Sequence, residues 1–174
     1  MRVLGISGSL RSDSSNHALL RAIPQLAPDC TVVIYDGIAA LPHFSPDRDV
    51  EPAPSEVARL RTLVREAEAL VVSSPEYAHG MPGSLKNALD WLVSSGELEG
   101  KPLALLVASP SGGQYAQASL TPTLEVMGAA LVAATAFTFT RKQIDDTGRL
   151  VDHAVAETLR TSLAALAASA AGAP

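Results

Sequence analysis

The chain of 174 residues has the length of one domain, and 47% of its residues are hydrophobic, which excludes a disordered protein. Its net charge of −5 and its low aromatic content of 4% are not those of a protein that binds nucleic acid or an anionic membrane. We therefore expect one domain over residues 1–174, with residues 168–174 as a frayed tail, and neither nucleic acid nor membrane as a partner.

The single cysteine, Cys30, excludes an internal disulfide and agrees with a reducing compartment. It precedes an apolar run, so we interpret it as a small core residue. A phosphatase-type thiolate loop is excluded because Asp36 stands where that loop requires arginine. No apolar leader follows Met1, and no run is apolar and long enough to span a bilayer, so we expect a cytoplasmic protein.

Short β-branched runs alternate with longer amphipathic segments along the chain. The expected strands are Val3–Ser7, Thr31–Tyr35, Ala69–Ser73, Leu103–Ala108 and Ala133–Thr140. The expected helices are Asn16–Ala27, a second one capped by Ser55, Ser84–Val93, Ala116–Gly128 with a start or kink at Pro122, and Asp152–Ala167. A long loop, Asp36–Pro54, follows the second strand.

This alternation predicts an α/β fold, a doubly wound parallel sheet of five strands with helices on both faces. We expect the strand order 2-1-3-4-5, which places the topological switch point between the first and third strands. Ligands of such sheets bind beyond the carboxyl ends of the strands. The loops after the first, third and fourth strands are therefore the candidate site.

The loop after the first strand, Gly8–Asn16, joins a strand to a helix N-terminus and carries hydroxyl and amide side chains with Arg11. Free N–H groups, the helix dipole and a guanidinium suit a terminal phosphomonoester. The patterns of a P-loop and of a dinucleotide fingerprint are absent. The alternative is an ordinary capped helix start, with Ser14, Ser15 or Asn16 as the cap.

The loop after the third strand, Ser74–Gly83, holds two prolines and two glycines and is therefore stiff. Its backbone can hydrogen-bond a planar heterocycle, which Tyr77 and His79 can border; the alternative is an ordinary loop with an exposed histidine. After the fourth strand, the pair Gly112–Gly113 allows close approach to a flat ring, or forms a flexible turn. The scattered histidines do not indicate a metal site.

Trp91, the only tryptophan, lies off the leucine face of its expected helix. Two interpretations remain open: it covers a subunit interface, or it packs under a loop of its own chain. Lys86 and Asp90 on the same helix are available for pairing across subunits, which favours a homodimer or homotetramer.

These motifs together resemble the NAD(P)H-dependent FMN reductase family, which is flavodoxin-like and includes quinone, azo-dye and chromate reductases. The resemblance covers nearly the whole chain, and its most specific part is Pro75-Glu76-Tyr77 with the following helix. The other residues that carry it are Gly8-Ser9-Leu10-Arg11, Ser14, Asn16, Leu41-Pro42, His79-Gly80, Pro82-Gly83, Leu85–Trp91, Gly112-Gly113 and Asp145–Leu150.

The resemblance implies FMN as the cofactor, NAD(P)H as the electron donor and a homo-oligomer with sites near subunit contacts. The residues implied to hold the FMN phosphate are Ser9, Arg11, Ser14, Ser15 and Asn16. Those implied to line the isoalloxazine, mostly through backbone, are Pro75, Glu76, Tyr77, Ala78, His79 and Gly80. Those implied to close the other side are Ser109, Gly112 and Gly113.

Two departures from the family pattern affect substrate preference. Ala78 stands where the family commonly has asparagine, and the glycine-rich stretch after the fourth strand is short, with Gln114 and Tyr115 following at once.

The expected reaction is ping-pong: hydride passes from NAD(P)H to FMN and then to a quinone, azo compound, metal oxyanion or free flavin. We expect no side-chain acid, base or metal, and backbone N–H groups of Glu76–Gly80 would stabilise charge on the reduced flavin. The alternative function is a non-enzymatic flavodoxin-like electron carrier. A receiver domain of the same topology is excluded because acidic residues are missing after the first strand and at the end of the third.

Overall fold

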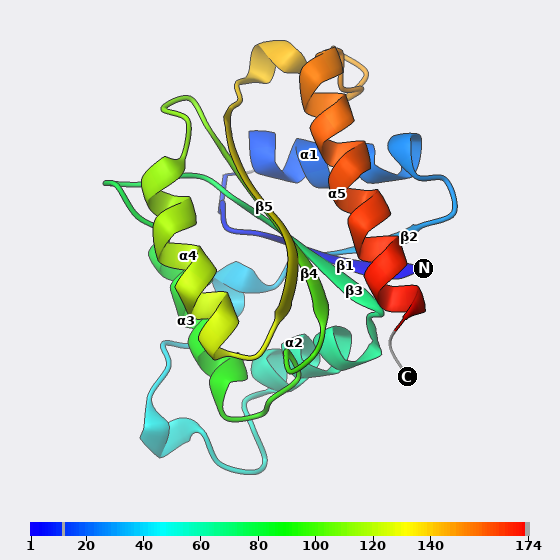
Figure 1. Cartoon of the computed structure of the whole chain (residues 1–174). Coiled ribbons are helices and arrows are strands. Elements are labelled where there is room, and N and C mark those ends of the chain that lie inside the picture. Colours follow the sequence, from blue (N-terminus) through cyan, green and yellow to red (C-terminus); the bar gives the residue numbers. More distant parts are fainter. Residues whose placement is uncertain (12, 173–174) are drawn as a thin grey trace.

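The computed structural model describes residues 1–11 and 13–172 and contains one sheet of five parallel strands, in the order β2-β1-β3-β4-β5. The strands are β1 (Arg2–Ser7), β2 (Thr31–Tyr35), β3 (Ala69–Ser74), β4 (Pro102–Ser109) and β5 (Ala130–Thr138). The helices are α1 (Ser15–Leu26), α2 (Ser55–Glu66), α3 (Gly83–Val93), α4 (Gln114–Val126) and α5 (His153–Ala171). Strands and helices alternate along the chain (Figure 1), which confirms the predicted doubly wound fold.

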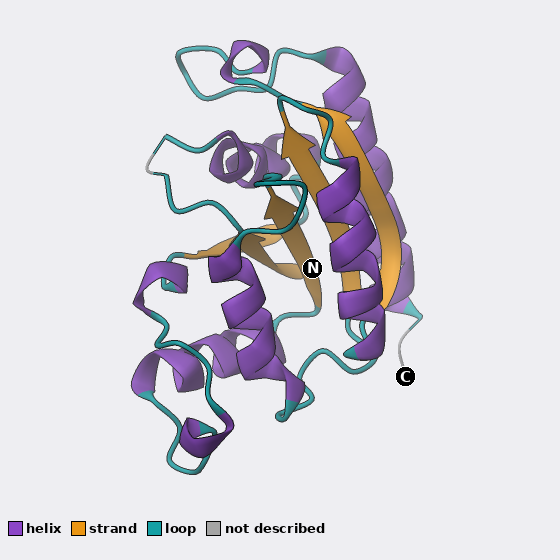
Figure 2. Cartoon of the chain, turned by 90° about the vertical axis from the view of Figure 1, so that its left-hand side faces the viewer, coloured by secondary structure: helices purple, strands orange, loops and turns teal. Residues whose placement is uncertain are grey.

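Two apolar layers hold the helices on the sheet. One lies beneath α2, α3 and α4 and includes Leu60, Leu89 and Leu120; the other lies beneath α1 and α5 and includes Leu20 and Leu163. Figure 2 shows helices on both sides of the strands. All residues of β3 and β4 are buried, as their continuous apolar sequences predict. Full burial of one such leucine contributes about 1.5–3 kcal/mol.

Most boundaries differ from the sequence prediction by a few residues, and three of these differences have a clear physical reason. β5 begins at Ala130 because that residue already pairs with Pro102 of β4. α4 begins at Gln114 and continues through Pro122, which has no N–H to donate. In a regular helix the carbonyl of Ala118 would accept a hydrogen bond from residue 122. Ala118 is exposed, so water can donate to this carbonyl instead. Ser55 does not cap α2: it is the first helical residue, and Pro54 occupies the cap position without a side-chain bond.

The C-terminal helix α5 packs against β3, β4, β5 and α1. It extends to Ala171 and so includes part of the expected tail 168–174, whose last two residues lie outside the described ones. No helix within residues 1–11 and 13–172 is long and apolar enough to cross a membrane.

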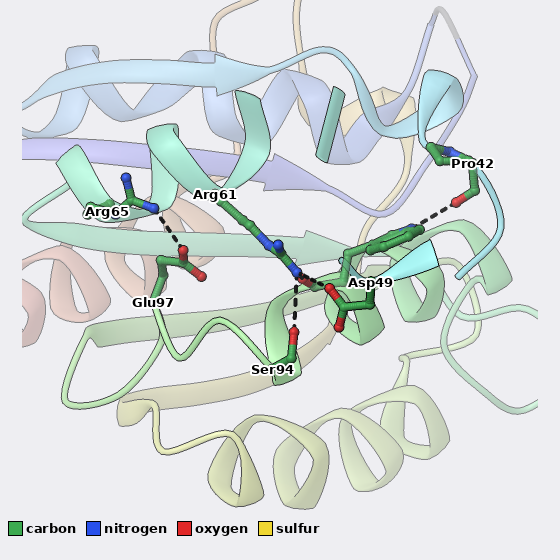
Figure 3. A network of polar contacts seen from close by, with 7 residues as sticks. Pro42, Asp49, Arg61, Arg65, Ser94 and Glu97 are labelled. Carbon is green, nitrogen blue, oxygen red and sulfur yellow. Dashed lines mark hydrogen bonds and ion pairs between the residues drawn. The ribbon is translucent and has the colours of Figure 1, made fainter. Parts of the chain in front are cut away.

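The long loop Asp36–Pro54 is fastened to α2 and α3 (Figure 3). Trp91 is fully buried, donates from Nε1 to the Pro42 carbonyl at 2.8 Å, and meets the Phe44 ring edge-on at 5.1 Å. Arg61 forms an ion pair with Asp49 at 2.8 Å and donates to the Trp91 carbonyl. Trp91 therefore packs under a loop of its own chain, and the interpretation that it covers a subunit interface is wrong.

Candidate active site

The carboxyl edge of the sheet carries a cavity of about 110 Å³ at the switch point between β1 and β3. It brings together the loops after β1, β3 and β4. Nine expected site residues line it: Ser9, Arg11, Ser14, Ser15, Asn16, Pro75, Glu76, Tyr77 and Ser109. The others lie outside its wall on the same loops: Ala78, His79, Gly80, Gly112 and Gly113.

Sequence reasoning missed Phe139, which lines the cavity from the segment after β5. It is almost fully buried, and its N–H donates to the Ser109 carbonyl at 3.1 Å. A usable signal was present, because an apolar residue just beyond a parallel strand must lie at the carboxyl edge with the other loops.

The loop after β1 is held in shape by its own serines. Ser14 is the N-cap of α1, and its Oγ accepts from the Asn16 N–H at 3.2 Å. The Ser9 Oγ accepts from the Arg11 N–H at 3.3 Å. The first turn of α1 contains no acidic side chain, so no carboxylate within that turn competes with a bound anion. This end of the cavity can hold an anion.

The Asn16 side chain links the three loops below the cavity. Its Nδ2 donates to the Ala108 carbonyl at 3.1 Å, and its Oδ1 accepts from the Ser73 hydroxyl at 2.8 Å. All three groups are buried, where unmade hydrogen bonds are costly. Asn16 thus ties the start of α1 to the ends of β3 and β4.

The loop after β3 ends in a two-residue hairpin. Tyr77 and Gly80 exchange two backbone hydrogen bonds of 3.0 and 2.9 Å, and the residues between them have positive φ, 48° at Ala78 and 58° at His79. This is the geometry of a type I′ turn, which favours asparagine and glycine. Ala78 and His79 therefore adopt a strained backbone at the mouth of the cavity.

Replacing Ala78 with asparagine relieves part of this strain, because asparagine tolerates the left-handed region better than alanine. We expect the free energy of unfolding to rise by about 0.5–1 kcal/mol, and Tm by roughly 1–4 °C in thermal unfolding. The control Ala164→Asn, at an exposed helical position of α5, should instead lower stability by about 0.5 kcal/mol. A fall in Tm for Ala78→Asn would contradict the turn assignment.

The loops after β3 and β4 meet through side chains. The Glu76 carboxylate accepts from the N–H groups of Tyr115 at 2.8 Å and Ala116 at 3.0 Å, and from the Ser111 hydroxyl at 3.1 Å. These bonds, led by that from Ala116, hold the pKa of Glu76 below its ordinary value. The His79 ring stacks on Tyr115 with centroids 4.2 Å apart. The two loops are therefore joined to each other by side-chain contacts.

This geometry combines an anion-binding end with a stiff, backbone-rich end. The first has a helix N-terminus, hydroxyl groups and a guanidinium, which suit a phosphomonoester. The second carries the exposed rings of Tyr77, which lines the cavity, and of Tyr115, which stacks on His79. A ligand with a phosphate at one end and a planar heterocycle at the other fits this arrangement.

Comparisons with known proteins agree with this chemistry. The family model of the NADPH-dependent FMN reductases matches residues 1–143. An NAD(P)H-dependent FMN reductase of Pseudomonas aeruginosa is 37% identical over 173 residues, covering 95% of this chain and 93% of that protein. A quinone reductase of Escherichia coli K12 is 31% identical over 174 residues, with the same coverage. The flavoenzyme FerB of Paracoccus denitrificans, an NAD(P)H:acceptor oxidoreductase, superimposes with a TM-score of 0.86 at 28% identity, over 98% of this chain and 97% of that one.

Proposed function

This chain belongs to the NADPH-dependent FMN reductase family, and we propose that the cavity at the carboxyl edge of its sheet is where it holds FMN. The chain is an NAD(P)H-dependent oxidoreductase with FMN as its cofactor. Bound FMN supplies the hydride chemistry, which protein side chains do not provide. The reductases among its relatives support this enzyme over the electron carrier that the sequence had left open.

The orientation of FMN follows from the two ends of the cavity. The phosphate lies at the N-terminus of α1, held by the residues that line this end: Ser9, Arg11, Ser14, Ser15 and the backbone of Asn16. The isoalloxazine would lie between the loop after β3, Pro75–Gly80, and the loop after β4 with Ser109, Gly112 and Gly113. Of these residues, Pro75, Glu76, Tyr77 and Ser109 line the cavity itself. The single observation that carries this proposal is that one cavity joins the anion-binding loop to the loops after β3 and β4.

The residues of the site bind and orient, and none is assigned as a general acid or base. The N–H groups of Tyr77 and Gly80 are used within the hairpin, so those of Glu76, Ala78 and His79 would be the ones to stabilise negative charge at the ring. NAD(P)H and the electron acceptor would bind in turn at the same exposed face of the flavin ring, which makes turnover ping-pong. The acceptor is a small molecule: a quinone, an azo compound, a metal oxyanion or free flavin.

The visible spectrum of the purified protein tests this function directly. We expect bound FMN to give the absorption of an oxidised flavin, which bleaches when NADPH or NADH is added without oxygen and returns when a quinone follows. A protein that binds no FMN from solution would contradict the proposal. One that binds FMN without bleaching would be an electron carrier.

Replacing Arg11 with alanine tests the orientation of the cofactor. Loss of a charge-assisted contact to the phosphate, about 1.5–3 kcal/mol, should weaken FMN binding roughly ten- to hundredfold. Riboflavin has the same ring without the phosphate, so its affinity should hardly change. Fluorescence titration measures the ratio of the FMN and riboflavin affinities. An equal loss of affinity for both flavins would show that Arg11 does not contact the phosphate.

We also propose that the protein is a homodimer or homotetramer. The outward face of α4 carries four exposed, uncharged residues, Tyr115, Ala118, Pro122 and Val126. The neighbouring edge strand β5 is only half-buried from Ala130 to Phe137. Lys86 pairs with Asp90 in its own helix at 2.5 Å and gives this proposal no support. Light scattering that yields 18 kDa at micromolar concentration would contradict it.

The cytoplasm remains the proposed location, supported by the single thiol, Cys30. Residues 1–174 remain a proposed single FMN-binding domain, supported by the one five-stranded sheet and the apolar layers by which all five helices pack on it. Cell fractionation tests the proposed location, and limited proteolysis of the FMN-bound protein tests whether residues 1–174 form a single domain.

A further inference from the structure

The helix α4 begins at the cavity edge without a cap from its own sequence. Gly113 occupies the N-cap position with a φ of 79°, and it has no side chain to accept a hydrogen bond. The first turn of α4 also contains no acidic residue. The N–H groups that open a helix have no partner within the helix and need acceptors from elsewhere.

Glu76 provides these acceptors from the loop after β3. One carboxylate oxygen accepts from Tyr115 and Ala116, and the other accepts from Ser111. The Ser111 hydroxyl lies 2.9 Å from that of Ser109, at the end of β4. One side chain thus fixes the loop after β3 to both the loop after β4 and the first turn of α4.

We infer that Glu76 is a positioning residue that sets the separation of the two loops between which the flavin ring lies. This inference rests on the proposed placement of FMN. Glu76 lines the cavity, while its carboxylate is bound by Ser111 and the first turn of α4, so it acts on the ring through the loops. The carboxylate also closes the α4 N-terminus to a ligand phosphate, whereas the first turn of α1 has no acidic side chain.

A shift of these loops should affect hydride transfer more than the anchoring of FMN. The reacting atoms of hydride donor and acceptor must be aligned closely, and a displacement near 1 Å can reduce a rate by about 10²-fold. The phosphate contacts lie on the α1 side of the cavity, so they stay intact when the hydrogen bonds of the Glu76 carboxylate are removed.

Glu76→Gln keeps the size of the side chain and removes its charge, and Glu76→Ala removes all its contacts. The control is Glu125→Gln, an exposed position near the other end of α4. In the FMN-free protein, amide exchange at Tyr115 and Ala116 should be faster in both Glu76 variants and unchanged in the control. This readout does not depend on activity.

With flavin added, both Glu76 variants should bind FMN and riboflavin more weakly by the same factor, about tenfold. The ratio of the two affinities then stays that of the wild type, unlike in Arg11→Ala. Hydride transfer, followed as flavin bleaching in stopped flow, should slow roughly ten- to hundredfold. Acetate should partly restore the rate of Glu76→Ala, because it can replace the missing carboxylate.

The outcomes separate the inference from the proposed function. A wild type that binds no FMN would overturn the proposed function, and the amide-exchange result would then apply to the cap alone. Wild-type flavin affinities and bleaching rates in both Glu76 variants would overturn the inference. If neither variant folds, Ser111→Ala removes one of the three contacts and should slow bleaching about threefold, and no slowing would overturn it.

Discussion

Gly113→Ala is expected to lower the free energy of unfolding by about 2–5 kcal/mol and to weaken FMN binding with it. Gly113 has a φ of 79°, a conformation that costs alanine about 1–2 kcal/mol. The added Cβ would lie 2.4 Å from Cγ1 of Val107, in the buried strand β4, and such overpacking costs about 1–3 kcal/mol. Because Gly113 lies between the loop after β4 and α4, the backbone shift that relieves this clash moves that loop, which lines the cavity with Ser109 and Pro110.

Two glycines serve as matched controls in chemical denaturation. Gly112 also has a positive φ, 95°, but the nearest atom to its added Cβ is the Thr138 Oγ1 at 4.0 Å. Gly112→Ala should therefore cost the conformational part alone, about 1–2 kcal/mol. Gly83 has no atom within 4 Å and no positive φ, so Gly83→Ala should not destabilise the protein. Equal stabilities of the three variants would refute the clash at Val107.

Arg61→Leu is expected to lower the free energy of unfolding by about 3 kcal/mol. Arg61 and Asp49 are both largely buried, and they hold the long loop against α2 and α3 (Figure 3). Removing Arg61 leaves the Asp49 carboxylate without its ion pair, and the Trp91 carbonyl loses two hydrogen bonds from the guanidinium. The value lies at the low end for broken buried pairs because water reaches part of Asp49.

The pH dependence of this effect follows from Asp49. Hydrogen bonds from Ser94 and Arg61 hold the pKa of Asp49 below its ordinary value of 3.8. A lowered folded-state pKa contributes stability above the unfolded pKa and loses it as the pH falls through the folded one. The difference between wild type and Arg61→Leu should therefore shrink below about pH 4 in urea denaturation.

Arg59→Leu, on the same helix, is the matched control for this pair. Arg59 pairs with Asp36, but both side chains are exposed, so we expect a small effect. An equal loss of stability in the two variants would show that the burial of the Arg61 pair is not what matters. If the difference in free energy of unfolding between wild type and Arg61→Leu stays constant below pH 4, the Asp49 carboxylate is not its cause.

The sequence was sufficient to predict the fold because the patterns that specify strands and helices lie between near neighbours in the chain. The alternation of apolar runs and amphipathic segments identified all five strands and all five helices, and β2 has the predicted bounds. Parallel topology then places the loops after β1, β3 and β4 at one edge, so nine expected site residues lie in the wall of one cavity. Wrong boundaries, as at α4, reflect propensities that tertiary packing overrides.

The partners of individual side chains were decided only by the tertiary structure. Glu76 caps a helix that begins 38 residues later, Arg61 meets Asp49 beside the Trp91 carbonyl, and Phe139 completes the cavity from beyond β5. Nothing in the sequence around Trp91 distinguished its own loop from a second subunit. Periodicity and turn composition act between near neighbours and can be read from the sequence, whereas contacts between distant segments exist only once the sheet brings those segments together.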